Sequence, residues 1–325
     1  MYLKDLKFSL WADFIERDYL DREFRDLIAR GIINGATSNP AIFKNAILTS
    51  GAYKEQLSSL NHLSAKEKYE ALAIYDIQKA ADILKPLYES SDDGYVSIEV
   101  DPFLCDDAKA TIKEGKRLYK EIGRKNVMIK VPATHDGYEA MEELSASGIP
   151  VNATLVFKKE QALKCAEAFG RAAKKNRGVD SVISVFVSRI DRALDAELQK
   201  NSLPLCLSGI YNSADIYNEI ENMNIPKCRV LFASTGVKDD SLPPHYYIEK
   251  LLAYNSINTA PIDTIKAFDK SGKKVASLPI SSTIINEHFE KIAKIGIDFN
   301  AILDKQIEDG LKAFKDAFNE ILESL

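Results

Sequence analysis

The 325-residue sequence is poor in the residues that usually hold metals or build disulfide frameworks. Its four cysteines are widely spaced without a C-x-x-C pair, and its four histidines show no i, i+4 pair or other metal-ligand spacing. We therefore expect no metal site and reduced thiols, although the even number of cysteines leaves disulfides open. The residues concerned are Cys105, Cys165, Cys206, Cys228, His62, His135, His245 and His288.

The sequence also lacks the features of membrane and nucleic-acid-binding proteins. No apolar run approaches the length that spans a bilayer, and the N-terminal MYLKDLKFSLWADF lacks a basic start followed by a long apolar core. The formal net charge is -5, which argues against a broad basic surface for nucleic acid or another polyanion. We expect a cytoplasmic protein that binds neither a membrane nor nucleic acid, and monomer and homodimer both stay open.

Glycine-rich phosphate loops are absent as well, since neither G-x-G-x-x-G nor G-x-x-x-x-G-K-[ST] occurs. Instead, short apolar runs alternate with longer helical patterns, without a compositional break. This alternation implies a parallel sheet, and eight such units fit a (β/α)8 TIM barrel formed by residues 1–325 as a single domain. An open doubly wound sheet is the alternative, but its usual Gly-rich turn is missing. The expected strands are residues 8–14, 35–39, 96–100, 127–131, 151–157, 181–187, 228–234 and 257–262.

Helical patterns separate most of these strands and continue after the last one. Apolar residues at helical spacing predict helices over 65–89, 106–122, 158–175 and 282–295. Near the C-terminus, Leu303, Ile307, Leu311, Phe314 and Phe318 form a stripe with a 3.6-residue period, which predicts a long final helix. Its apolar face either packs on the barrel wall or covers part of the barrel mouth.

Lys130 interrupts a run, Val127 to Val131, that otherwise has the composition of a fully buried strand. Burying an ammonium group is costly unless the group is paired, neutralised or used. A lysine pushed toward its neutral form is a nucleophile that forms a Schiff base with a carbonyl compound. The alternative is a strand-end lysine whose stem covers apolar surface while its head reaches water.

In the predicted strands, polar residues occupy every second position, on one face, and aliphatic residues occupy the positions between them, on the other face. In a closed barrel one parity faces the lumen, and catalytic groups lie at the carboxyl ends of the strands. The shared pocket that this predicts holds one lysine, two carboxylates and no histidine, which favours amine catalysis on a carbonyl group. Each position alone also has a structural explanation; for example, Glu99 can simply pair with Lys130. The polar set comprises Asp13, Thr37, Asn39, Glu99, Lys130, Asn152, Thr154 and Ser184.

Several segments, in the right order, resemble the transaldolase family. Gly35–Phe43 contains its T-[ST]-N-P motif, and Ile129–Tyr138 is similar to its active-site lysine motif. Further matching segments are WAD at 11–13, SIEVD at 97–101, NATLVF at 152–157 and SVFVSR at 184–189. The resemblance implies a (β/α)8 barrel that transfers a dihydroxyacetone unit between sugar phosphates without a metal or organic cofactor. The implied reaction converts sedoheptulose 7-phosphate and glyceraldehyde 3-phosphate to erythrose 4-phosphate and fructose 6-phosphate, in the non-oxidative pentose phosphate pathway.

The resemblance also implies roles for individual residues. Lys130 forms the Schiff base, Asp13 is the general base for C–C cleavage, and Glu99 and Thr154 hold a proton-shuttling water. The three-carbon unit is bound or shaped by Thr37, Asn39, Asn152, Ser184 and Phe186, and the substrate phosphate by Arg189 and Ser234.

One position departs from the common family pattern. Many transaldolases carry a second phosphate-binding arginine two residues beyond the match to Ser234, where this chain has Gly236. The segment resembles instead the S-T-G-x-K loop of a longer bacterial branch. Lys238 either supplies the second positive charge or faces solvent.

Two other functions stay open. A fructose 6-phosphate aldolase shares the fold and imine chemistry but releases free dihydroxyacetone; such relatives tend to be shorter and to carry Gln and Tyr at the positions of Glu99 and Phe186. A noncatalytic sugar-phosphate-binding protein is the alternative of another class, although it predicts a broken set of catalytic residues.

Overall fold

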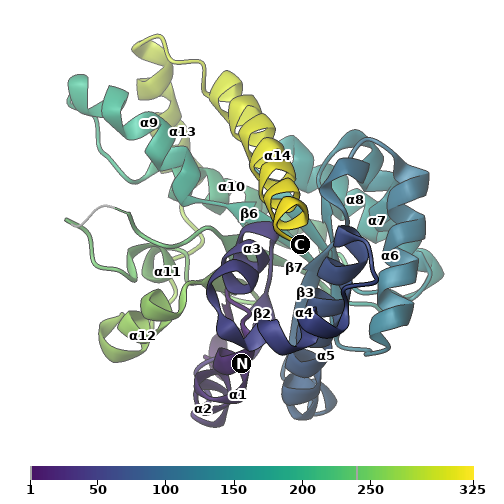
Figure 1. Cartoon of the computed structure of the whole chain (residues 1–325). Coiled ribbons are helices and arrows are strands. Elements are labelled where there is room, and N and C mark those ends of the chain that lie inside the picture. Colours follow the sequence, from purple (N-terminus) through teal and green to yellow (C-terminus); the bar gives the residue numbers. More distant parts are fainter. Residues whose placement is uncertain (1, 239–240) are drawn as a thin grey trace.

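The computed structural model describes residues 2–238 and 241–325. Within them, eight parallel strands close into a barrel in chain order, which confirms the TIM-barrel prediction and shows that the open-sheet alternative is wrong (Figure 1). The strands are β1 (Ser9–Ala12), β2 (Gly35–Thr37), β3 (Tyr95–Glu99), β4 (Val127–Pro132), β5 (Val151–Val156), β6 (Ser181–Phe186), β7 (Cys228–Ala233) and β8 (Ile257–Ala260).

Helices surround this barrel, and the predicted ones are present, two of them with starts that a capping side chain explains. The helix expected from residue 106 starts at Ala108 because the Asp107 side chain accepts a hydrogen bond from the Ala110 amide, 2.9 Å away. The last helix starts at Phe299 because Asp298 caps the Ala301 amide in the same way. The helices are α1 (Arg17–Asp21), α2 (Glu23–Ala29), α3 (Pro40–Thr49), α4 (Lys54–Ser59), α5 (Ala65–Glu89), α6 (Ala108–Ile122), α7 (His135–Ala146), α8 (Lys159–Lys175), α9 (Ser188–Lys200), α10 (Ser208–Met223), α11 (Tyr246–Lys250), α12 (Ile262–Ser271), α13 (Ser282–Lys294) and α14 (Phe299–Ser324), with short 3-10 turns η1 (Lys4–Leu6), η2 (Gly51–Tyr53) and η3 (Pro102–Leu104).

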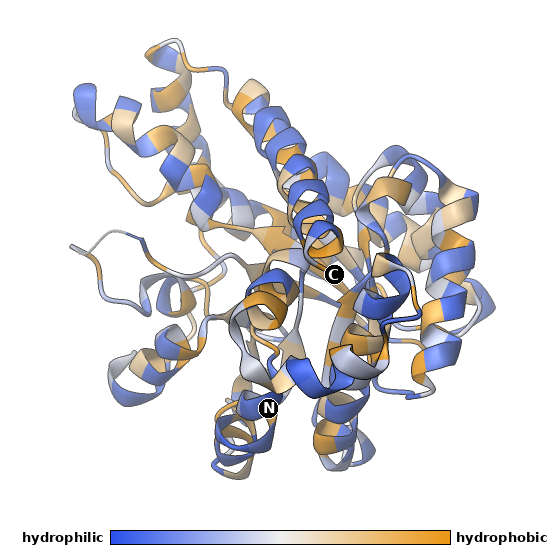
Figure 2. Ribbon diagram, in the orientation of Figure 1, coloured by the Kyte–Doolittle hydropathy of each residue, from blue (hydrophilic) through white to orange (hydrophobic). Residues whose placement is uncertain are grey.

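The barrel has two clusters of buried apolar side chains, one outside the strands and one that reaches into the lumen. The aliphatic parity, represented by Ile98 and Ile129, packs outward under the helices, and Figure 2 shows the hydrophobic strands inside the helical layer. A second cluster contains Trp11 and Met128 from the lumen-facing parity. Trp11 is fully buried, and a Cβ at Gly35 would lie 2.5 Å from its indole ring, so only glycine fits there. Because these side chains fill part of the lumen, the space for a functional cavity lies at the carboxyl ends of the strands.

Leu155 does not follow the predicted alternation. The register of β5 and β6 shifts between Ala153 and Val156, and Leu155 has a positive φ of 57°. The resulting bulge places Leu155 in the second cluster with Phe186 and Phe314 rather than under the outer helices. Strict alternation along β5 would place Leu155 on the outward face with Ala153, and the bulge shows that this expectation is wrong.

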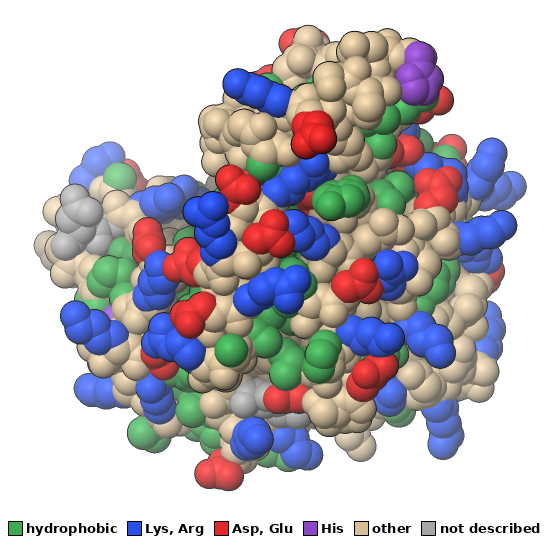
Figure 3. All heavy atoms as spheres, turned by 60° about the horizontal axis from the view of Figure 1, so that its bottom comes forward, with side chains coloured by type: hydrophobic (Ala, Val, Ile, Leu, Met, Phe, Trp, Pro, Cys, Tyr) green, Lys and Arg blue, Asp and Glu red, His purple; other side chains and the backbone are tan. Residues whose placement is uncertain are grey.

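The outer surface fits the modest net charge. On the face seen in Figure 3, lysine and arginine side chains alternate with aspartate and glutamate side chains and form no continuous patch of one sign. None of the helices in the described ranges has the length and apolar character needed to cross a membrane.

Candidate active site

A cavity of about 170 Å³ opens among the carboxyl ends of the strands. Its walls bring together residues that are far apart in the sequence and that were predicted to act in catalysis or to bind the substrate. Those that line it are Asp13, Thr37, Asn39, Lys130, Thr154, Ser184, Phe186, Arg189 and Ser234, together with Ala41, Ala233, Thr259, Ala313 and Phe314, which sequence reasoning did not select.

Lys130 projects from β4 into this cavity and is only 5% exposed. Its Nζ donates a hydrogen bond of 2.9 Å to the Ser38 carbonyl oxygen and lies 3.5 Å from Glu99 Oε1. The alternative of a lysine head in bulk water is therefore wrong. The Ser38 carbonyl was not predicted, because a backbone acceptor leaves no mark on residue identity.

Glu99 ends β3 beside Lys130, and its side chain is 6% exposed. Neither carboxylate oxygen has a hydrogen-bond partner among the described residues, and the same holds for Thr154 Oγ1. Burial raises the pKa of Glu99 to about 7, although the Lys130 ammonium acts in the opposite direction. A carboxyl group with this pKa can both accept and donate a proton near neutral pH.

Asp13 follows β1 and is held by two threonines. Thr37 Oγ1 donates to Asp13 Oδ1 at 2.7 Å and also lies 2.6 Å from Thr259 Oγ1. Because a hydroxyl has one proton, the Thr259 hydroxyl must donate to Thr37 while Thr37 donates to the carboxylate. Burial raises the pKa of Asp13, whereas Lys130, the Thr37 hydrogen bond and Arg189 lower it. Thr259 was missed, because it follows another polar residue in β8, so that each face carries one polar side chain and the alternation test gives no choice between them.

Some of the predicted amide and hydroxyl residues line the cavity, and others hold the lining residues in place. Ser184 lines the cavity and donates to Asn152 Oδ1 at 2.7 Å, while Asn152 Nδ2 donates to Ser97 Oγ at 3.1 Å. Asn152 is fully buried and lies behind Ser184 rather than in the cavity lining. Asn39 caps α3 by accepting from the Ile42 amide at 3.0 Å, so its amide nitrogen stays available to the cavity.

A cationic end of the cavity is formed by the loop after β7 and the start of α9. The Arg189 guanidinium lies 5.1 Å from the Phe186 ring centre, and burial lowers the pKa of Arg189 without making it a neutral group. Ser234 Oγ lies 3.2 Å from Ser188 Oγ, at the first turn of α9. A helix start with an arginine and hydroxyl groups favours a phosphate.

Lys238 is not brought to this end. Its side chain is exposed, and it is not among the residues that line the cavity.

The C-terminal helix covers part of the barrel mouth, which settles the choice left open by its apolar stripe. Ala313 and Phe314 of α14 line the cavity. A Cβ at Gly310 would lie 2.9 Å from Leu155 Cδ2, so α14 approaches the bulge of β5 closely. Lys44 of α3 holds the helix through an ion pair of 3.0 Å with Glu320.

The described residues contain no group of three or more His, Cys, Asp or Glu side chains arranged to hold a metal ion. The chemistry available to the cavity is that of an amine, two carboxyl groups and hydrogen-bonding amides and hydroxyls.

Comparison with known proteins agrees with this constellation. The family model described as transaldolase/fructose-6-phosphate aldolase matches residues 10–325. The chain belongs to this family. Among its relatives, a protein named transaldolase from Campylobacter jejuni is 47% identical over 330 residues, which cover 98% of this chain and 99% of the relative. A protein of the same name from Helicobacter pylori is 45% identical over 320 residues, with the same coverage. The family description covers both transfer and aldolase activity, whereas both of these relatives are named for transfer.

Proposed function

We propose that this member of the family is a transaldolase, a transferase that moves a dihydroxyacetone unit between phosphorylated sugars in the non-oxidative pentose phosphate pathway. The observation that carries the proposal is the buried Lys130 amine in a cavity, 3.5 Å from Glu99 and in the field of Asp13. The proposed reaction converts sedoheptulose 7-phosphate and glyceraldehyde 3-phosphate to erythrose 4-phosphate and fructose 6-phosphate. Full-length similarity to relatives named transaldolase supports it.

The first chemical step is formation of the imine. Lys130 must lose a proton before its nitrogen can attack the ketose carbonyl at C2, and Glu99 is the neighbouring acceptor. The carbinolamine oxygen then takes a proton from Glu99 and leaves as water, which gives a protonated imine. The partnerless hydroxyl of Thr154 suits it to hold this water together with Glu99.

The second step is cleavage of the C3–C4 bond. Asp13 takes the proton of the C4 hydroxyl, the bond electrons move into the imine, and the shortened aldose leaves while an enamine stays on Lys130. An acceptor aldose then reacts by the reverse steps. Asp13 suits this role because Thr37 and Thr259 fix its orientation.

Retention of the three-carbon unit distinguishes transfer from the aldolase alternative. We propose that Asn39 and Ser184 bind this unit, that Asn152 positions the Ser184 hydroxyl rather than touching the unit itself, and that Phe186 limits access of water to the imine. Glu99 and Phe186 stand at positions where the aldolases that this chain resembles tend to carry Gln and Tyr, which favours transfer.

Arg189 and Ser234 are the proposed phosphate ligands, since both line the cationic end of the cavity. Replacing Lys238 with Ala tests the second positive charge. A raised KM for a phosphorylated acceptor supports that role, and an unchanged KM assigns Lys238 to solvent.

The function is tested by incubating the purified protein with fructose 6-phosphate and erythrose 4-phosphate, and measuring glyceraldehyde 3-phosphate and free dihydroxyacetone. Stoichiometric aldose production without dihydroxyacetone supports transfer. Equal release of dihydroxyacetone favours the aldolase, and absence of both products favours a binding protein. Full activity after chelator treatment and dialysis would support a reaction without metal or dissociable cofactor.

Three further properties are proposals that rest on this function. We propose one domain over residues 1–325, a monomer or homodimer in solution, and a cytoplasmic location, where the phosphorylated substrates are made and consumed. A single unfolding transition, light scattering and cell fractionation test them in turn.

A further inference from the structure

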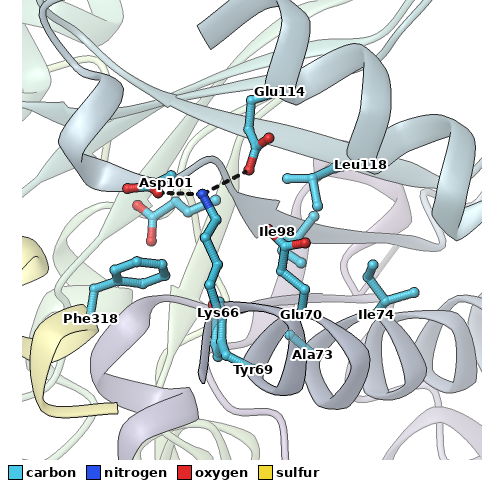
Figure 4. Close-up of a pocket in the computed structure, with 11 residues that line it drawn as sticks. Lys66, Tyr69, Glu70, Ala73, Ile74, Ile98, Asp101, Glu114, Leu118 and Phe318 are labelled. Atoms are coloured by element: carbon cyan, nitrogen blue, oxygen red, sulfur yellow. Dashed lines mark hydrogen bonds and ion pairs between the residues drawn. The ribbon is translucent and has the colours of Figure 1, made fainter. Parts of the chain in front are cut away.

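A second, much smaller cavity is lined by Glu99 and Ile98 of β3 and by residues of α5 and α6. Its volume is about 10 Å³, which is about the space of a single water molecule. Figure 4 shows Lys66, which belongs to α5, pointing toward Asp101 and Glu114, with Phe318 of α14 on one side. The polar groups therefore face a space in which a water can bind and a larger ligand cannot.

Glu99 borders this small cavity rather than the large one. Both of its oxygens are buried and lack a hydrogen-bond partner in the described part of the chain. A buried carboxylate without partners is costly, and such groups in folded proteins are usually satisfied by an ordered water. Glu99, whose oxygens are both unpaired, thus lines the water-sized space.

An ion pair connects this space to the protein surface. Lys66 Nζ lies 2.6 Å from Asp101 Oδ2 and 3.9 Å from Glu114 Oε1, and the Lys66 side chain is 41% exposed. Arg117 neutralises the neighbouring carboxylates, with distances of 2.7 Å to Glu70 and 2.9 Å to Glu114. Lys66 and Asp101 are then the charged groups of this outer cluster that Arg117 does not engage.

Glu99 is consequently flanked by charged and other ionisable groups on two sides. From the barrel it faces Lys130, Asp13 and Arg189. From the outer layer it faces Lys66, Tyr69, Glu70, Asp101 and Glu114.

We propose that one water molecule occupies the small cavity and links Glu99 to the Lys66–Asp101 ion pair, which positions the carboxylate against Lys130 from outside the barrel. The inference rests on the proposed function, in which Glu99 moves protons for Lys130. Lys66 and Asp101 are positioning residues, because they act through Glu99 and do not reach the large cavity.

Two substitutions with opposite electrostatic effects test this link. Lys66→Met removes a positive charge behind Glu99, so the shared proton of Glu99 and Lys130 should be held more tightly. In the pH profile of kcat, the midpoint of the acid limb should then move to higher pH, by about half a unit. Asp101→Asn removes a negative charge and should move the midpoint to lower pH by a similar amount. The asparagine oxygen can still accept from the Phe103 amide, as Asp101 does at 2.9 Å.

The matched control is Lys116→Met. Lys116 pairs with Glu143 at 2.7 Å on the outer surface, its side chain is 42% exposed, and it does not border the cavity. The control should keep the wild-type midpoint, and Lys66→Arg should retain most of the wild-type profile. Thermal unfolding of each variant separates lost stability from a changed profile.

Unchanged midpoints in both variants, shifts in the same direction, or an equal shift in Lys116→Met would overturn the proposal. If either test variant does not fold, a crystal structure of the wild-type protein decides, since an ordered water within hydrogen-bond distance of Glu99 supports the link and an empty cavity refutes it. Failure of the wild-type protein to form an imine would instead overturn the proposed function.

Discussion

The Glu99 carboxylate lies 3.5 Å from the Lys130 ammonium group, yet neither of its oxygens has a hydrogen-bond partner among the described residues. A purely structural ion pair in a barrel interior would be expected to have its remaining oxygens satisfied. The partner of Glu99, Lys130, lines the 170 Å³ cavity, and incomplete satisfaction of a carboxylate next to such a group is typical of residues that exchange protons with a substrate or water.

Replacing Glu99 with Gln should slow imine formation. The amide keeps the shape of the side chain but cannot move a proton, so kcat should fall by about 10²–10⁴-fold, the usual contribution of a general acid–base group. The acid limb that reflects the pKa near 7 should also disappear from the pH profile. Rates of imine trapping across pH 5 to 9 check both expectations. Wild-type kinetics in the variant would remove Glu99 from the mechanism.

Thr259 should matter to the reaction although it does not bear a charge. Thr259→Val removes the hydroxyl that donates to Thr37, so Thr37 is a weaker donor to Asp13. We expect kcat to fall by about two- to tenfold, in line with the net value of one hydrogen bond, with little change in KM. Thr259→Ser, which keeps the hydroxyl, should restore most of the rate. A loss in both variants would indicate a packing role instead.

Phe314 should control how well the three-carbon unit is retained. Phe314→Ala removes the α14 ring that lines the cavity, so water and dihydroxyacetone pass the mouth more easily. The ratio of dihydroxyacetone release to transfer should rise severalfold. Lys312→Ala, an exposed position on the same helix, serves as the control. An unchanged ratio in Phe314→Ala would show that α14 does not shield the imine.

The buried carboxyl group of Asp191, which does not line the cavity, should make the stability of the protein depend on pH. Burial raises the pKa of this α9 carboxyl to about 7, although the Gly209 amide and the Tyr247 hydroxyl donate to it at 2.7 and 2.8 Å. The folded protein then binds more protons at this site than the unfolded chain between about pH 4 and 7, so the Asp191 contribution to stability decreases as pH rises through that range.

Asp191→Asn should remove this decrease. Relative to wild type, the variant should gain unfolding free energy between pH 5 and 8, by more than about 1 kcal/mol. Urea unfolding at several pH values measures the difference. A constant difference across the range would mean that Asp191 is already ionised in the folded protein at pH 5.

The sequence was sufficient to predict the barrel and most of the cavity, because both depend on alternation. Strands with one polar and one aliphatic parity place Asp13, Lys130 and Ser184 in a shared lumen whatever the details of packing. The bulge at Leu155 was not predictable in this way, since it depends on the fit of β5 against β6 and α14 rather than on residue type.

Other features needed three-dimensional information. The Ser38 carbonyl and the water-sized cavity behind Glu99 are made by backbone and by side chains from separate elements, which no local pattern reports. The apolar stripe of α14 fits a wall and a mouth equally well, and only its contact with the cavity through Phe314 distinguishes them. Lys238 was selected by motif position alone, and its exposed side chain is not part of the cavity lining.

The most direct test of the central claim is borohydride reduction in the presence of fructose 6-phosphate, followed by peptide mass mapping. We expect a three-carbon adduct on Lys130, with no adduct in a Lys130→Met variant. No adduct, or one on a different lysine, would contradict the imine mechanism and favour a noncatalytic sugar-phosphate-binding protein.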